Sequence, residues 1–310
     1  MVCLHLQSTY MKQLYRIFSA SCSTMSEKDL LICETGGDRQ IFAPLRILCF
    51  DIETNIPNAR TNQFSDPRND SVIQIGNMVS LYGEKQKPFI RSVFTLGTCE
   101  SIQGCQVLPF TNEKELLMAW QKFFLEIDPD IVMGYNITQF DIPYLLNRAR
   151  TLGLAKFSFF GRIQGVPQRL RAGVPHFLTC PGYEGRLLLD IFHHIRERHP
   201  GLPGEGAYKL NGVSLHFLGQ KKEDISYKQI PALQSGDANT RRHLALYCLK
   251  DVYLPLLLLD KLDAFELEVT ESQDAHVPFN VMRVWRSLKD VAKRCNGAIN
   301  HGYVIADKIK

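Results

Sequence analysis

The sequence has little net charge, no closely spaced cysteine pair and no long apolar run. Its 310 residues carry a formal net charge of +4, which permits a nucleic-acid partner without arguing for one. The nine cysteines are scattered and form no C-x-x-C pair, so neither a zinc ribbon nor a redox motif is expected. Their spacing suits reduced thiols in an intracellular protein. No stretch reaches the roughly 18 apolar residues that span a bilayer, so no membrane partner is expected.

Acidic residues are missing from the first 26 positions, which carry Lys12, Arg16 and several serines. This composition is weakly similar to that of mitochondrial transit peptides. The alternative is a ragged N-terminus or part of another domain, and we favour this second interpretation.

Hydrophobic patterns predict strands and helices in alternation. Strands are expected over 46–54, 72–81, 90–96 and 131–133, and helices over 112–128, 208–218 and 237–265, with another starting near residue 141. A strand that runs into a helix is expected over 186–195. Pro255 should kink the longest helix. This order indicates an α/β or mixed α+β layer fold.

Two acids, Asp51 and Glu53, interrupt an apolar strand over 46–54. Positions i and i+2 of a strand share one face, so their side chains would lie side by side. Two carboxylates this close repel each other, and burying them is costly without a cation. The alternative is a strand end at which both acids reach solvent.

Three later residues complete a candidate constellation. Asp141 precedes a predicted helix. It could be a functional acid, or it could be nothing more than the N-cap of that helix. Tyr247 and Asp251 are four residues apart in the longest predicted helix and so stack on one face. Separately, Asp251 could be a solvated helix residue and Tyr247 a core or surface aromatic.

Taken together, the order and spacing of these residues resemble the exonuclease motifs of family B DNA polymerases, the tyrosine class of the DEDD 3′–5′ exonucleases. Phe50-Asp51-Ile52-Glu53 resembles the first motif. Gly134-Tyr135-Asn136-Ile137-Thr138-Gln139-Phe140-Asp141 resembles the second, and Tyr247-Cys248-Leu249-Lys250-Asp251 the third. Further segments are similar to the delta branch of this family: residues 43–47, 128–130, 208–211, 216–218 and 240–242.

The resemblance implies an RNase H-like α/β fold and a proofreading-type 3′–5′ exonuclease that hydrolyses phosphodiesters with two Mg²⁺ ions, for which Mn²⁺ can substitute. Hard cations prefer oxygen ligands, in keeping with Asp and Glu. By this resemblance Asp51 binds both ions, Glu53 and Asp251 complete one site, and Asp141 holds the other. Tyr247 orients the attacking water.

The resemblance also implies partners and a compartment. Asn136 and Phe140 are expected to hold the single-stranded or frayed 3′ end of DNA, and stacking of a base on an aromatic ring is physically reasonable. Phe140 could alternatively be a core residue. Replication polymerase subunits are further expected partners, and the nucleus is the expected compartment, with mitochondria as the weaker alternative.

Some features depart from the family. The palm motifs D-x-x-S-L-Y-P and Y-G-D-T-D do not occur, so no polymerase activity is expected from these 310 residues. We predict a partial N-terminal region over 1–42, an exonuclease domain over 43–265 and a divergent helical tail over 266–310. Two rival functions stay open: a non-catalytic module that binds single-stranded DNA or a replication partner, and a DEDD ribonuclease. The acids alone cannot separate DNA from RNA.

Overall fold

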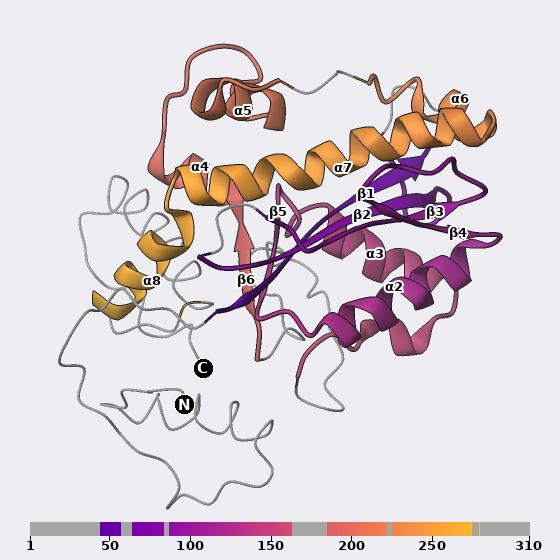
Figure 1. The fold of residues 1–310 in the computed structure, drawn as a ribbon, viewed down its shortest axis with the longest axis horizontal. Coiled ribbons are helices and arrows are strands. Elements are labelled where there is room, and N and C mark those ends of the chain that lie inside the picture. The colour runs from indigo at the N-terminus through magenta and orange to yellow at the C-terminus, as the bar shows by residue number, and fades with distance from the viewer. Residues whose placement is uncertain are drawn as a thin grey trace, which may run out of the picture.

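A computed structural model describes residues 44–56, 64–83, 87–162, 185–221, 225–274 and 279. The predicted N-terminal region over 1–42, including its possible transit peptide, lies outside these residues, as does most of the tail over 266–310. The described residues form a mixed sheet with helices on both faces (Figure 1). The predicted α/β class is therefore confirmed.

The sheet has six strands in the order β4-β3-β2-β1-β5-β6. The strands are β1 (Arg46–Asn55), β2 (Ser71–Leu81), β3 (Ile90–Leu96), β4 (Gln106–Phe110), β5 (Ile131–Gly134) and β6 (Leu187–Asp190). β1, β2 and β3 form an antiparallel meander, whereas β4, β5 and β6 each join the sheet in parallel. The sequence predicted three strands at the start and missed β4, an edge strand that contains Pro109, a residue that edges tolerate.

Helices cover both faces of the sheet. They are α2 (Glu113–Ile127), α3 (Asp141–Thr151), α4 (Ile191–Arg198), α5 (Leu210–Leu218), α6 (Ile230–Ser235), α7 (Ala238–Lys261) and α8 (Ala264–Asp274), with a 3₁₀ turn, η3 (Ala155–Ser158). Asn112 and Asp237 cap α2 and α7 through their side chains, because each accepts a hydrogen bond from a first-turn amide. The predicted helix over 237–265 is two helices, and α7 continues through Pro255.

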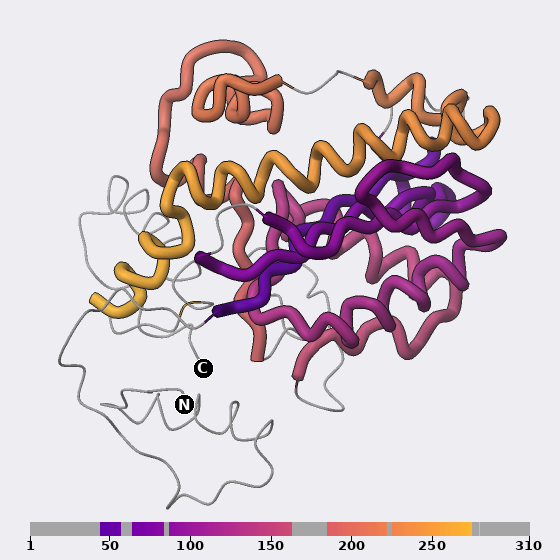
Figure 2. The backbone as a smooth tube through the Cα atoms, viewed as in Figure 1, coloured from indigo at the N-terminus to yellow at the C-terminus, as the bar shows by residue number. Residues whose placement is uncertain are grey.

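Alternation along β1 assigns its residues to two hydrophobic cores. Leu48, Phe50 and Ile52 pack with α2 and α3, whereas Ile47 and Cys49 pack with α7. Figure 2 traces the long α7 across one side of the sheet, with α2 and α3 on the other. The odd-numbered positions of β1 therefore face α7. None of the helices among the described residues combines the length and the apolar composition that a membrane span requires.

Candidate active site

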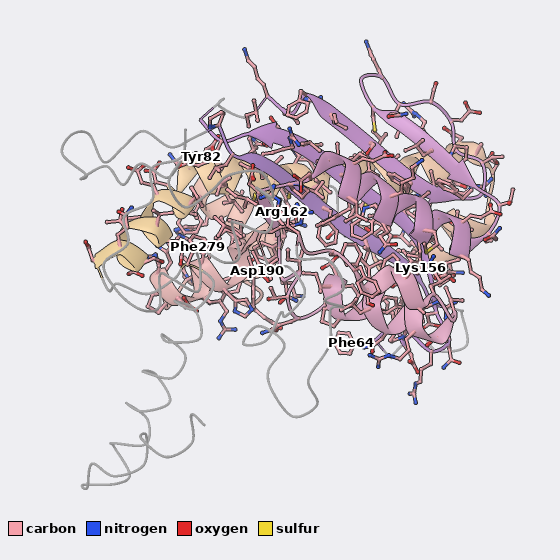
Figure 3. The ribbon with its side chains drawn as sticks, turned by 90° about the horizontal axis from the view of Figure 1, so that it is seen from below. Phe64, Tyr82, Lys156, Arg162, Asp190 and Phe279 are labelled. Carbon is pink, nitrogen blue, oxygen red and sulfur yellow. The ribbon has the colours of Figure 1, made fainter. Side chains whose placement is uncertain are left out.

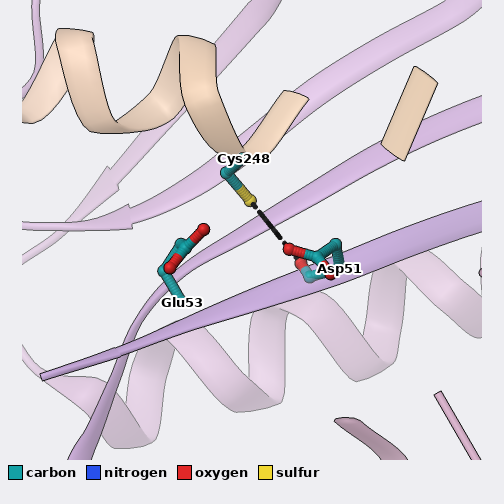
Figure 4. A group of neighbouring side chains, drawn as sticks. All are labelled: Asp51, Glu53 and Cys248. Carbon is teal, nitrogen blue, oxygen red and sulfur yellow. Dashed lines mark hydrogen bonds between the residues drawn. The ribbon is translucent and has the colours of Figure 1, made fainter. Parts of the chain in front are cut away.

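Asp51 and Glu53 continue the face of β1 that α7 covers. Asp51 is half-buried and Glu53 is buried, with 7% of its surface exposed. The alternative of a solvated strand end is therefore wrong for Glu53. Both side chains point toward the underside of α7, where Cys248 meets them (Figure 4).

Cys248 was not among the predicted site residues, although it lies inside the third motif. Its Sγ lies 4.0 Å from Asp51 Oδ2 and 3.7 Å from the Asp51 carbonyl oxygen. One ligand atom each from Asp51, Glu53 and Cys248 lie within 4.8 Å of one another. Helical spacing was the available signal, because Cys248 is three residues before Asp251 and so shares its face.

Asp141 reaches the same region from α3. β1 pairs with β5 only as far as Cys49, opposite Met133. Beyond that point the Ile52 amide, between the two acids, donates to Asp141 Oδ1 at 3.0 Å. Asp141 is 2% exposed and is the first residue of α3, whose N-cap position is Phe140. The interpretation of Asp141 as only an N-cap is therefore wrong.

Asp251 and Tyr247 come from α7. Asp251 is buried and Tyr247 is half-buried one turn before it. Burial raises the pKa of Asp141 to about 7, and the charges of Asp190 and Asp251 act in the same direction. Asp251 is thus close enough to Asp141 for their charges to repel.

The pKa values of two buried thiols, Cys49 and Cys248, are raised in part by the same group of negative charges. Burial, followed by the charges of Asp51, Glu53 and Asp251, raises the pKa of the Cys248 thiol well above its usual value. Burial likewise raises the pKa of Cys49, with Asp51 and Asp141 adding to the effect. These mutual effects indicate that the four predicted carboxylates gather in one region from three elements.

Asp190 is a further residue whose role the sequence did not reveal. It is fully buried at the end of β6 and is labelled in Figure 3. Its carboxylate accepts hydrogen bonds from the amides of Asn136, Thr138 and Phe192 and from the Thr138 hydroxyl, at 2.6–3.1 Å. Asp190 therefore fixes the turn that leads from β5 to Asp141.

That turn also positions the two predicted substrate-binding residues. Asn136 has a left-handed backbone with φ of +63°, a conformation that Asn tolerates better than most residues. Phe140 is partly buried and packs on Tyr144, with ring centroids 5.5 Å apart. Phe140 therefore has a packing role, and contact with a substrate stays a prediction for both residues.

Two glycines allow the close packing around the site. Gly76 of β2 pairs with Asp51, and a Cβ there would lie 2.9 Å from Cys248 Sγ and 3.0 Å from Val252 Cγ2. A Cβ at Gly134 would lie 2.8 Å from the Phe50 carbonyl oxygen. The absence of a side chain at Gly76 lets α7 lie directly over β1 and β2.

The residues present fit a hard divalent cation. The ligand atoms are carboxylate oxygens from β1, α3 and α7, which Mg²⁺ and Mn²⁺ prefer. Buried acids that raise one another's pKa, as Asp141 and its neighbours do, become stable as charged groups once a cation lies between them. The carboxylate cluster can therefore hold a metal ion.

The profile of the DNA polymerase family B exonuclease domain matches residues 1–213. The chain belongs to this family. The match includes Asp51, Glu53 and Asp141, while Tyr247 and Asp251 lie beyond its end. Family B exonuclease domains use divalent metal ions, in agreement with the carboxylate cluster.

Relatives of this family B chain include DNA polymerase delta catalytic subunits. That of Candida albicans is 40% identical over 284 residues, which is 86% of this chain and 26% of the relative. That of Glycine max is 46% identical over 73% of this chain and 21% of the relative. The Schizosaccharomyces pombe subunit is 38% identical over 97% of this chain and 28% of its own length. The chain spans about a quarter of the length of these relatives.

A solved structure supports the fold. The family B DNA polymerase from Pyrobaculum calidifontis matches with a TM-score of 0.57 and 25% identity, over 79% of this chain and 28% of that one. The mixed six-stranded sheet with flanking helices is the RNase H-like fold of family B exonuclease domains, as predicted. The boundaries at 43 and 265 remain predictions.

Proposed function

We propose that this family B domain is a 3′–5′ DNA exonuclease that hydrolyses phosphodiester bonds with two divalent metal ions. The observation that carries the proposal is the convergence of Asp51, Glu53, Asp141 and Asp251 from β1, α3 and α7. Glu53, Asp141 and Asp251 are buried and therefore costly to charge without cations, so a metal-binding role explains why the acids are gathered.

The ligand set divides between the elements. Asp51 would contact both ions, Glu53 and Asp251 would complete one site, and Asp141 would belong to the other. Two ions, when bound, supply an activated water and neutralise charge at the phosphorus. Mg²⁺ is the expected ion, with Mn²⁺ as a substitute. The Ile52 amide, which donates to Asp141 Oδ1, would hold the carboxylate in place for this task.

Other residues would orient the reactants. Tyr247, one turn before Asp251 on α7, would hold the attacking water through its hydroxyl. Asn136 and Phe140, on the turn that Asp190 holds, would contact the single-stranded or frayed 3′ end. No protein nucleophile is needed, so no covalent intermediate is expected.

The wider role follows from the relatives. We expect the chain to act on DNA in replication, to contact replication polymerase subunits and to work in the nucleus. The comparisons give no support to the mitochondrial alternative. The 310 residues lack the palm motifs, so we expect no nucleotide incorporation by this polypeptide.

Degradation of 5′-labelled single-stranded DNA with Mg²⁺ tests the proposal. The wild type should produce a ladder that shortens from the 3′ end, and Asp51→Ala/Glu53→Ala should produce none. A folded wild type without a ladder would leave a binding module as the function. Equal ladders from both proteins would show that the degradation does not depend on Asp51 and Glu53, and would contradict the proposed site.

A matched RNA of the same length separates the remaining rival. Faster degradation of DNA than RNA supports the proposal, whereas faster degradation of RNA would make the protein a DEDD ribonuclease.

A further inference from the structure

The proposed metal site contains a soft ligand that the four-carboxylate set leaves unused. Cys248 projects from α7 toward the two acids of β1, with its Sγ 4.0 Å from Asp51 Oδ2 (Figure 4). Among the described residues, Asp51, Glu53 and Cys248 are the one group of His, Cys, Asp or Glu side chains with three ligand atoms mutually within 4.8 Å. The cluster joins two hard oxygen ligands with one thiol.

The spacing suits a small ion. Zinc bonds to sulfur at about 2.3 Å and to carboxylate oxygen at about 2.0–2.2 Å, so ligands of one tetrahedral zinc lie about 3.5 Å apart. For the pair Cys248 Sγ and Asp51 Oδ2, which are 4.0 Å apart, this requires a shift of about half an ångström, and a pair at the 4.8 Å limit of the group would require a shift of about 1.3 Å. Such a shift lies within ordinary side-chain adjustment.

The packing around the thiol keeps it in this place. Cys248 is fully buried on α7, three residues before the buried Asp251. A side chain at Gly76, beneath it on β2, would meet Sγ at 2.9 Å, so the glycine leaves the space that the thiol fills. The packing of α7 against β2 therefore holds the thiol beside the acids.

We propose that Asp51, Glu53 and Cys248 form a binding site for thiophilic divalent cations such as Zn²⁺ or Cd²⁺. The role of the acids here rests on the proposed function. Binding replaces the thiol proton with a metal–sulfur bond and releases the proton to the buffer, with no change of oxidation state. Softer ions gain from a sulfur ligand, whereas Mg²⁺ does not. Zinc bound here occupies acids that Mg²⁺ needs, so it inhibits the exonuclease.

Cobalt binding tests the inference without relying on catalysis. Co²⁺ stands in for Zn²⁺, and a cobalt–thiolate bond absorbs in the near ultraviolet. The complete chain should show this band, and Cys248→Ser should lose it. The matched control is Cys99→Ser, which removes a half-buried thiol far from these acids in the sequence and should keep the band. Competition with Zn²⁺ should give an affinity at least about tenfold weaker in Cys248→Ser.

A second variant guards against misfolding of Cys248→Ser. Asp51→Asn/Glu53→Gln keeps the thiol and should also lose most of the band, because two of the three ligands are gone. The affinity for Mg²⁺, measured from the rise in Tm as Mg²⁺ is added, should differ by less than about twofold between Cys248→Ser and the wild type.

The outcomes separate this inference from the proposed function. Equal bands and equal zinc affinities in Cys248→Ser and the wild type would overturn the site. A Cys248-dependent band in a protein that degrades no DNA would support the site and remove the proposed function. A Mg²⁺-dependent ladder without a Cys248-dependent band would overturn the Cys248 site and support the proposed function.

Discussion

At the residue scale, Asp190 illustrates how one buried carboxylate can organise the turn beside a site without being one of the four proposed metal ligands. Both of its oxygens accept hydrogen bonds, from two amides at Oδ1 and from the amide and hydroxyl of Thr138 at Oδ2. Each donor would be costly to leave unpaired in the interior. The turn over Asn136 and Thr138, which leads to Asp141, therefore depends on this side chain.

Asp190→Asn should destabilise the fold although the two side chains have the same shape. An Asn side chain carries an NH₂ group in place of one carboxylate oxygen. That NH₂ group would face the N–H and O–H donors that the oxygen now accepts. We expect a loss of about 3 kcal/mol in the free energy of unfolding, measured by urea denaturation.

Asp237→Asn is the matched control. Asp237 is an exposed N-cap whose Oδ1 accepts hydrogen bonds from the amides of Asn239 and Thr240, and Asn caps helices as well as Asp does. Its unfolding free energy should change by less than about 0.5 kcal/mol. Equal losses in the two variants would contradict the role assigned to Asp190.

At the element scale, the contact between α7 and β2 sets the distance between the third motif and the first. Gly76 lies opposite Asp51 in the antiparallel pair and beneath Cys248 and Val252. Helix and strand could not approach as closely with a side chain at this position. The geometry of the site therefore depends on a glycine that is remote from all three motifs in sequence.

Gly76→Ala should cost about 1–3 kcal/mol of unfolding free energy, because the added methyl group meets Cys248 Sγ in a packed interior. In a Cys248→Ala background the cost should fall, since the nearest contact is removed. A double-mutant cycle by urea denaturation measures this coupling. A cost that is the same in both backgrounds would show that Sγ does not limit the approach.

A second element-scale feature ties the end of α2 to β6. Asp128, which ends α2, bonds to Arg186 Nη1 at 2.6 Å and to Arg162 Nε at 2.9 Å. Burial acts to raise the pKa of Asp128, but the two arginines outweigh it and lower the pKa below 3.8. The stabilisation is therefore present above the unfolded pKa and is lost as pH falls through the folded one.

Acid should consequently destabilise the wild type more than Asp128→Asn, which cannot lose this charge. Urea denaturation at pH 7 and at a pH below the folded pKa of Asp128 measures the difference. A pH dependence that is identical in the two proteins would contradict a contribution from this cluster.

The sequence predicted the helices and strands better than it predicted the contacts between them. Periodicity located β1, β2, β3, α2 and the start of α7, because these elements carry regular apolar patterns. It missed β4, whose five residues include a proline and lie at the sheet edge. The roles of Asp190, Gly76 and Cys248 depend on contacts across the fold, which local patterns do not encode.

At the scale of the whole molecule, the fold brings distant parts of the chain together. Cys49 of β1 and Val252 of α7 are 203 residues apart in sequence, yet the Cys49 thiol donates a hydrogen bond to the Val252 carbonyl oxygen. Asp51 and Glu53, the start of α3 and the middle of α7 thereby become neighbours. The family resemblance supplied the grouping of these acids, whereas the spacing alone left each with another explanation.

The central claim is that four acids from three elements act as one metal site. The most direct measurement is the rate of 3′-end removal from 5′-labelled single-stranded DNA in Mg²⁺, for Asp51→Asn, Glu53→Gln, Asp141→Asn and Asp251→Asn. Glu126→Gln, an exposed acid on α2, serves as the control and should keep the wild-type rate.

Each site variant should fold and lose at least about 100-fold in rate, because removing a metal ligand costs more than removing its outer hydrogen-bond partners. Combining two of them should add little, since the acids work as a unit. A folded variant among the four that keeps the wild-type rate would contradict the claim, as would losses that simply multiply.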